Sequence, residues 1–206
     1  MPDFPLIVVA LTVCAYWGRV GAMVARARRK SRHLAGLVPE QPKERAMWLV
    51  WVPLVAAWMT LPWLGVARAA GTLAVPAFAQ EMPYAVLRWI AAGVAVWSLL
   101  QTLRCWRRMG KDWRMDVSQE KAALITDGLY ARIRHPIYAF SILLMLCTLL
   151  VLPTPAMAVL AAVHVVLMNV KARNEERHLL EVHGEPYARY LRGTGRFIPR
   201  FGGPGS

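Results

Sequence analysis

The chain has 206 residues, of which 57% are hydrophobic and 18% are charged, and its mean hydropathy is +0.36. The hydropathy is higher and the charged fraction lower than a soluble globular domain usually has. Nine tryptophans, ten methionines and fourteen prolines exclude a disordered or low-complexity chain. The formal net charge of +13 would favour a nucleic-acid partner in a soluble protein, so the positions of the charges decide what it means.

Apolar runs predict an all-α membrane bundle of about five transmembrane helices, because a helix needs about 20 residues to span a bilayer. The first three helices are expected at residues 4–25, 46–67 and 84–103. The last two are expected at 137–152 and 156–172, and both are short. Only two prolines and a threonine separate them, which predicts a tight helical hairpin that either crosses fully or dips into the membrane. We expect one membrane domain over residues 1–206.

Basic residues gather in three segments of the chain. Residues 26–45, 104–136 and 171–200 together hold 22 of the 25 Lys and Arg residues, and five crossings would put all three segments on one side. The positive-inside rule then predicts an integral protein of a bacterial inner membrane, with its N-terminus outside and its C-terminus cytoplasmic. Topology thus explains the net charge, and no nucleic-acid partner is expected. Arg19 and Arg88 lie within helices, where we expect their side chains to snorkel to the interface.

The cysteines do not indicate a structural or metal site. Cys14, Cys105 and Cys147 are widely spaced and form neither a CxxC pair nor a cluster with histidines. This spacing predicts no disulfide framework and no metal site. The chain also lacks the GxGxxG motif of dinucleotide-binding Rossmann domains.

Polar and aromatic residues are concentrated on either side of the predicted hairpin. Residues 110–138 contain a turn signal followed by Tyr, Arg, His and Pro directly before the fourth helix. In residues 171–200, Gly184 is expected to end one helix and Pro186 suits the first turn of the next. Both segments are cytoplasmic in the predicted topology, so we expect the functional site there.

One helical stripe leads from the membrane into the second of these segments. Its members fall on one face at about 100° per residue, and they are His164, Met168, Lys171 and Glu175. Lys171 and Glu175 form either an i,i+4 ion pair at the membrane surface or part of a site for a charged ligand. His164 is either a packing residue or a functional one. Arg173 and Glu176 point away from the stripe.

The same region carries a resemblance to a known family, in both the order and the spacing of its motifs. The matching residues are Gly128-Leu129-Tyr130, Arg134-His135-Pro136-Ile137-Tyr138, Glu175-Glu176, Leu179, Gly184, Tyr187, Tyr190 and Arg196-Phe197-Ile198-Pro199. Through them the chain resembles the isoprenylcysteine carboxyl methyltransferase and phospholipid methyltransferase superfamily of integral membrane enzymes. The resemblance covers roughly residues 105–200.

The resemblance implies a methyltransferase that uses S-adenosyl-L-methionine and acts on a lipophilic small molecule or a lipid, among membrane lipids. It makes residues 104–200 the catalytic region and residues 1–103 the N-terminal membrane helices. The acceptor stays open among a prenylated or other lipophilic carboxylate, a phospholipid amine and a small thiol. By the resemblance, the cofactor contacts Leu124, Ile125, Tyr130, His135, Pro136, Ile137, Tyr138 and Glu175.

The resemblance also suggests catalytic roles for two residues. Lys171 stands where the carboxyl methyltransferases have an arginine, and it would orient an anionic acceptor. Its ammonium group would do so as a point charge, without the two parallel hydrogen bonds that a planar guanidinium offers. His135, beside Pro136, either braces the fourth helix or relays a proton from an ammonium acceptor.

Two other functions remain open from the sequence alone. An NADPH-dependent membrane reductase of the sterol-reductase type would be similar in its C-terminal helices, although such chains are larger. A non-enzymatic membrane assembly or regulatory protein would keep the fold without turnover. Cofactor binding distinguishes the three functions.

Overall fold

The computed structural model describes residues 2–30, 42–67, 73–109 and 124–200, and it describes no side chains for residues 27–30 and 42–46. The predicted basic segments 26–45 and 104–136 therefore lie partly outside the described residues.

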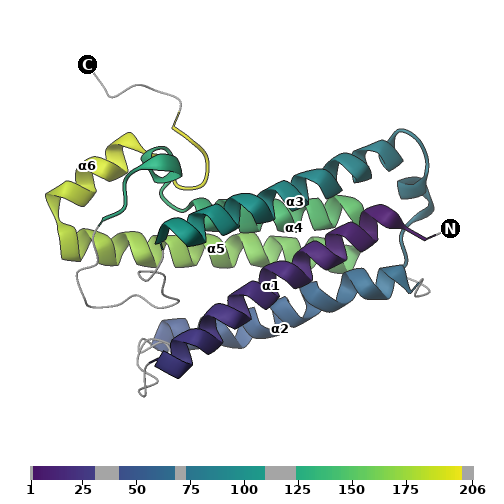
Figure 1. The fold of residues 1–206 in the computed structure, drawn as a ribbon, viewed down its shortest axis with the longest axis horizontal. Helices are drawn as coiled ribbons and strands as arrows, with labels where there is room; N and C mark the ends of the chain where they lie inside the picture. Colours follow the sequence, from purple (N-terminus) through teal and green to yellow (C-terminus); the bar gives the residue numbers. More distant parts are fainter. Residues whose placement is uncertain (1, 31–41, 68–72, 110–123, 201–206) are drawn as a thin grey trace.

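Five long helices pack side by side, as Figure 1 shows. They are α1 (Phe4–Lys30), α2 (Pro42–Val66), α3 (Tyr84–Met109), α4 (Pro136–Val151) and α5 (Pro155–His183). A shorter helix and two 3-10 helices complete the described elements, namely α6 (Glu185–Gly193), η2 (Ala77–Gln80) and η4 (Gly128–Ala131). The described part of the chain contains no strand beyond one isolated bridge between Ile133 and Gly195, so the predicted all-α fold is confirmed.

Four of the helices, α1, α2, α3 and α5, are long and apolar enough to cross a membrane. The remaining long helix, α4, has 16 residues, which is about 24 Å at a rise of 1.5 Å per residue. This length is less than the roughly 30 Å of a bilayer's hydrocarbon core. The prediction of a short fourth helix is therefore confirmed.

The predicted length of the fifth helix is wrong. Instead of ending at residue 172, α5 has 29 residues and ends at His183. The apolar run stops near Val170, but the residues that follow are mostly good helix formers with no glycine or proline before Gly184. Gly184 then adopts a φ of +60°, which ends the helix where the sequence predicts.

The hairpin between α4 and α5 forms as predicted. Pro136 and Pro155 each stand in the first turn of their helix. Backbone N–H groups in the first turn have no acceptor within the helix, so the missing N–H of a proline costs no hydrogen bond there. Thr154 caps α5, because its hydroxyl oxygen accepts a hydrogen bond of 3.3 Å from the Met157 N–H. The two helices therefore start at fixed residues and pack antiparallel against each other.

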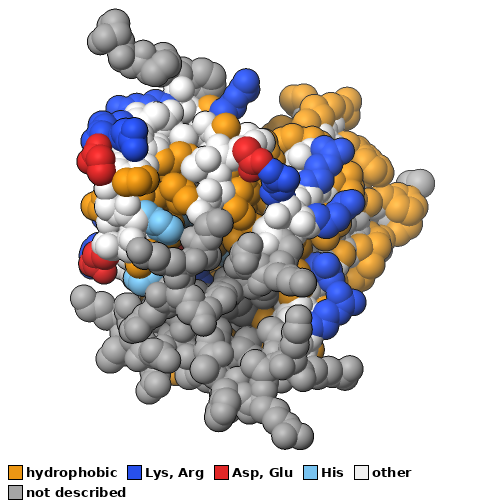
Figure 2. Space-filling view, turned by 60° about the vertical axis from the view of Figure 1, so that its left-hand side comes forward, with side chains coloured by type: hydrophobic (Ala, Val, Ile, Leu, Met, Phe, Trp, Pro, Cys, Tyr) orange, Lys and Arg blue, Asp and Glu red, His pale blue; other side chains and the backbone are white. Residues whose placement is uncertain are grey.

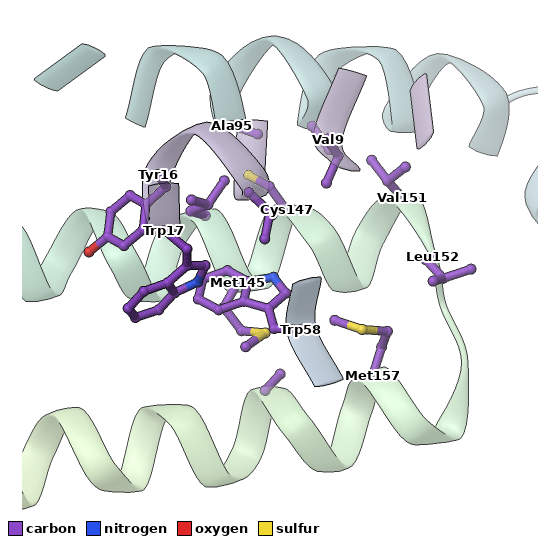
Figure 3. Packing of buried hydrophobic residues seen from close by; sticks show 14 of the residues in the cluster. Val9, Tyr16, Trp17, Trp58, Ala95, Met145, Cys147, Val151, Leu152 and Met157 are labelled. Atoms are coloured by element: carbon purple, nitrogen blue, oxygen red, sulfur yellow. The ribbon is translucent and has the colours of Figure 1, made fainter. Parts of the chain in front are cut away.

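The centre of the bundle is built around Trp58 of α2, which is fully buried. Trp58 belongs to the same buried cluster as Trp17 of α1 and Met145 of α4, and its ring centroid lies 5.9 Å from that of Trp17 (Figure 3). Its indole N–H donates a hydrogen bond of 3.1 Å to the Thr148 hydroxyl, so the one polar atom of this large side chain is satisfied within the apolar core.

Arg88 does not snorkel, and that expectation is wrong. Its side chain is only 5% exposed and makes two contacts at the end of the bundle opposite α6. Its Nη2 lies 2.5 Å from Asp3 Oδ2, and its Nε donates a hydrogen bond of 2.9 Å to the Val151 carbonyl. A charge inside the bundle requires such partners, and these tie the start of α1 and the end of α4 to α3.

Replacing Arg88 with alanine should destabilise the protein by about 3 kcal/mol, because the buried Val151 carbonyl and the Asp3 carboxylate would lose their partner. Thermal melting of the detergent-solubilised protein, followed by tryptophan fluorescence, measures the change. Arg104→Ala on the same helix is the control, since Arg104 is exposed and its loss should change stability by less than about 0.5 kcal/mol. Equal melting temperatures for the two variants would contradict the proposed anchor.

Candidate functional site

A cavity of about 280 Å³ lies at the α6 end of the bundle. Its walls come from the middle of α1, Trp51 of α2, the last turn of α3, the first two turns of α4 and the second half of α5. Residues of η4, of α6 and of the segments on either side of η4 complete them. The residues predicted from the resemblance all line it, namely Leu124, Ile125, Tyr130, His135, Pro136, Ile137, Tyr138, Lys171 and Glu175. The fold thus brings together three segments that are separated in the sequence.

Two consecutive carboxylates of α5 bracket the imidazole of His135. Nδ1 of His135 lies 3.4 Å from Glu175 Oε2, and Nε2 lies 3.3 Å from Glu176 Oε1, although this second contact lacks the angle of a hydrogen bond. Burial opposes a charge on the ring, but the two carboxylates outweigh it and raise the pKa of His135 above its usual value. A protonated His135 therefore fits this position.

Glu175 is the carboxylate that faces the cavity. The Tyr138 hydroxyl donates a hydrogen bond to its Oε1, and the Tyr138 ring stacks on His135 with centroids 5.4 Å apart. Lys171 lies one turn earlier on the same face and interacts electrostatically with Glu175, so the predicted neighbours are confirmed as neighbours. The Glu175 side chain is 28% exposed, which leaves part of it open to the cavity.

Glu176 does not line the cavity and binds two arginines instead. Its carboxylate accepts hydrogen bonds of 2.9 Å from Arg134 Nε and of 2.6 Å from Arg196 Nη2, and its side chain is only 10% exposed. The backbone N–H of Arg134 also donates a hydrogen bond of 2.8 Å to the backbone carbonyl of Gly195. These contacts hold the chain after α6 against the segment that carries His135.

The sequence reasoning did not assign Glu176 and Arg196 to the site. Glu176 lies off the stripe as predicted, and it does not line the cavity. The stripe does not predict what Glu176 contacts on the other side of α5. A signal was nevertheless present, because a carboxylate close to an apolar helix needs a cationic partner. Arg134 and Arg196 both stand in the motifs that carry the resemblance.

Aromatic residues form the other half of the cavity wall, and the sequence did not single them out either. They come from α1, α2 and α3 and are Tyr16, Trp17, Trp51 and Trp106. The Tyr16 ring packs against Trp17 and Trp106, with centroid distances of 5.1 and 5.3 Å. The cavity therefore has a polar half, around Glu175, and an aromatic half, made by these four rings.

A smaller cavity of about 30 Å³ adjoins the first one between α2 and α5. Three residues line both cavities, Trp51, Met168 and Lys171. The smaller cavity is otherwise apolar, with Met47, Trp48 and Leu167 in its wall. Lys171 thus stands where the polar half of the main cavity meets an apolar space.

The surface around this end changes character over a short distance. Figure 2, in which the left-hand side of Figure 1 comes forward, shows Lys and Arg side chains on this end and hydrophobic side chains over the adjoining flank. Large apolar residues of the long helices, such as Trp89 and Trp97 of α3 and Val166 of α5, are about half exposed. A flank of this kind is typical of a bilayer-facing surface.

The comparison with protein families matches the description "Phospholipid methyltransferase" to residues 81–186. The chain belongs to the phospholipid methyltransferase family. The resemblance drawn from the motifs is thereby confirmed, and membership implies an integral membrane methyltransferase. The match includes all the predicted site residues but not Tyr16, Trp17 or Trp51, so most of the aromatic half lies outside the part of the chain that carries the family's pattern. No curated protein matches the chain at a significant level.

The raised pKa of His135 predicts a pH-dependent stability for this methyltransferase. A raised folded-state pKa contributes stability that is fully present below the unfolded value of about 6.5 and is lost as the pH rises through the folded value. The wild-type melting temperature should therefore fall from about pH 6.5 upward relative to His135→Gln, which has no ring to titrate. The comparison of these two proteins cancels every titration that they share, and parallel pH profiles would contradict the prediction.

Proposed function

We propose that the protein transfers the methyl group of S-adenosylmethionine to a lipophilic acceptor within the cavity at the α6 end. One observation carries the proposal: a single cavity joins a polar half with an available carboxylate to an aromatic half that borders an apolar space. In the predicted topology this end is cytoplasmic, which would let a water-soluble cofactor enter from the cytoplasm and an apolar acceptor from the membrane.

The residues of the polar half fit the cofactor. Glu175 would accept hydrogen bonds from its amino group or its ribose hydroxyls, and Leu124 and Ile125 would pack on its adenine. The Tyr130 hydroxyl is buried and has no partner among the described residues, so it is available to a ligand. Burial also raises the pKa of Tyr130, which keeps this hydroxyl neutral.

When bound, S-adenosylmethionine supplies a methyl group that forms a bond to a lone pair of the acceptor while its bond to sulfur breaks and the electron pair stays on sulfur. The protein's part in such a displacement is to align the reactants and exclude water. The aromatic half would exclude water from the acceptor. Lys171, at the border of the two halves, would attract an anionic acceptor group.

For His135 the geometry supports positioning better than proton relay. A relay from an ammonium acceptor needs a neutral imidazole, and both neighbouring carboxylates oppose that state. A charged His135 would instead hold Glu175 at a fixed place in the cavity. The acceptor's identity stays among a lipophilic carboxylate, a phospholipid amine and a thiol.

Calorimetric titration of the detergent-purified protein with S-adenosylhomocysteine, and in parallel with NADPH, tests the reaction class. We expect saturable binding of S-adenosylhomocysteine alone. Binding of NADPH alone would replace the proposal with a reductase. Binding of neither by a folded sample would favour a non-enzymatic protein.

Glu175→Ala should weaken S-adenosylhomocysteine binding by at least about tenfold, because a charged hydrogen bond contributes roughly 1.5 to 3 kcal/mol. His135→Ala should weaken it less, since His135 would act through Glu175. Arg173→Ala is the matched control, because Arg173 lies on the same helix but is exposed and outside the cavity. Unchanged affinity in a well-folded Glu175→Ala protein would overturn the assignment of Glu175.

Lys171→Ala should leave cofactor affinity within about twofold and raise the KM for an anionic acceptor by about tenfold, since it removes an attraction to the acceptor that is made before the transition state. The assay is methyl transfer from radiolabelled S-adenosylmethionine to N-acetyl-S-farnesylcysteine, with phosphatidylethanolamine in mixed micelles as the amine probe. A Lys171→Ala protein that loses cofactor binding and keeps its KM would contradict this role.

A further inference from the structure

Three polar side chains from three helices link the cavity to the apolar centre of the bundle. They are Tyr16 of α1, Ser141 of α4 and His164 of α5. The Ser141 Oγ lies 3.1 Å from His164 Nε2, and the Ser141 side chain is also hydrogen-bonded to Tyr16. Tyr16 and Ser141 line the cavity, whereas His164 is completely buried behind them.

This chain of contacts is more than apolar packing requires. Hydroxyl and imidazole groups lose hydration when they are buried, and they recover it only if they are hydrogen-bonded. His164 packs its ring against Trp58, 5.1 Å between centroids, and its Nδ1 has no partner among the described residues. Among the described residues, the hydrogen-bond partner of His164 is Ser141.

The missing partner of Nδ1 indicates the direction of the hydrogen bonds. Neutral imidazole carries one N–H, and a buried N–H without an acceptor is strongly unfavourable. The hydrogen therefore belongs on Nε2, which donates to the Ser141 oxygen. Ser141 can then donate to the Tyr16 oxygen, and this leaves the Tyr16 O–H to donate elsewhere.

The position of Tyr16 shows where that donor can act. Figure 3 shows Tyr16 at the edge of the buried cluster, with its hydroxyl directed away from Trp58 and Met145. Tyr16 of α1 belongs to the aromatic half of the cavity, whereas Glu175 of α5 belongs to the polar half. It also lies outside the matched residues 81–186, so a role for it would be particular to this chain's first helix.

From this geometry we propose that the Tyr16 hydroxyl, oriented by Ser141 and His164, donates a hydrogen bond to an oxygen of the methyl acceptor's head group. Tyr16 is thus an acceptor-binding residue, and Ser141 and His164 are positioning residues that act through it. The oxygen is that of a carboxylate or of a phosphate, since both present lone pairs to an O–H donor. This inference rests on the proposed function, because it assigns the aromatic half to the acceptor.

The test measures acceptor KM, kcat and S-adenosylhomocysteine affinity for purified variants. The probes are N-acetyl-S-farnesylcysteine, phosphatidylethanolamine in mixed micelles and dodecanethiol, with radiolabelled S-adenosylmethionine as donor. Tyr16→Phe should raise the KM for an oxygen-bearing probe by about tenfold with kcat and cofactor affinity within about twofold. Ser141→Ala should raise KM in the same way, and Ser141→Thr, which restores a hydroxyl, should return it towards the wild-type value.

A double variant separates positioning from a merely structural role. If Ser141 acts through Tyr16, Tyr16→Phe combined with Ser141→Ala should have the KM of Tyr16→Phe alone. Thr148→Val is the matched control, because Thr148 is an equally buried hydroxyl on α4 that binds Trp58 and does not line the cavity. Its KM should equal that of the wild type.

The outcomes separate this inference from the proposed function. A wild-type protein that binds no S-adenosylhomocysteine, or that methylates none of the three probes, overturns both. A wild-type protein that is active while Tyr16→Phe keeps its KM, or while the two substitutions have additive effects, overturns this inference alone. Activity towards dodecanethiol only would also overturn it, because that acceptor has no oxygen.

Discussion

The site depends above all on one buried carboxylate, that of Glu176. It receives hydrogen bonds from Arg134, which precedes α4, and from Arg196, which follows α6. A buried carboxylate that loses a cationic partner is strongly destabilised, so these elements cannot separate easily. The same group lies beside one nitrogen of His135, and the opposite nitrogen faces Glu175. The position of Glu175, the carboxylate that lines the cavity, is in this way tied to an ion-pair cluster in which Glu176 and Arg196 lie outside the cavity wall.

The two halves of the cavity differ in where they lie along the chain. The polar half falls inside residues 81–186, the part that matches the phospholipid methyltransferase family, and so do Ser141 and His164. Three of the four aromatic rings come from α1 and α2, which precede that part. A family can keep one way of holding its cofactor while the first helices vary with the molecule that is modified. If the proposed function holds, the aromatic half is the part of this protein that would determine specificity for the acceptor.

Much of the fold was predictable because hydropathy reports directly on membrane helices. The helix positions, the short α4 and the hairpin at Pro155 all follow from apolar runs and prolines. The apolar run alone gave too short an α5, because the helix continues by backbone propensity after that run has stopped, as far as the predicted stop at Gly184. Arg88 was misjudged because snorkelling treats a helix as if it stood alone in lipid, whereas Asp3, far away in the sequence, provides the partner.

The site was only half predictable, for a related reason. Motif order and spacing were enough to name residues such as His135 and Glu175, which the fold brings to one cavity. They could not supply the pairing of Glu176 with Arg196, which depends on how α6 returns the chain. They also could not distinguish Trp17 or Trp51 from the other tryptophans, because aromatic residues in membrane helices serve equally well against lipid and in a cavity wall.

Glu175 and Glu176 are neighbours on a helix, so their side chains leave α5 about 100° apart, one towards the cavity and one towards Arg134 and Arg196. A single turn of backbone thus carries both the ligand-facing group and the group that holds the end of the chain. A ligand that displaced Glu175 by moving the α5 backbone would also displace Glu176 and strain its ion pairs with Arg134 and Arg196. The backbone of α5 at Glu175 and Glu176 is consequently held rigidly. We therefore expect that side chains of the aromatic half, and not Glu175, adjust to ligands of different shape.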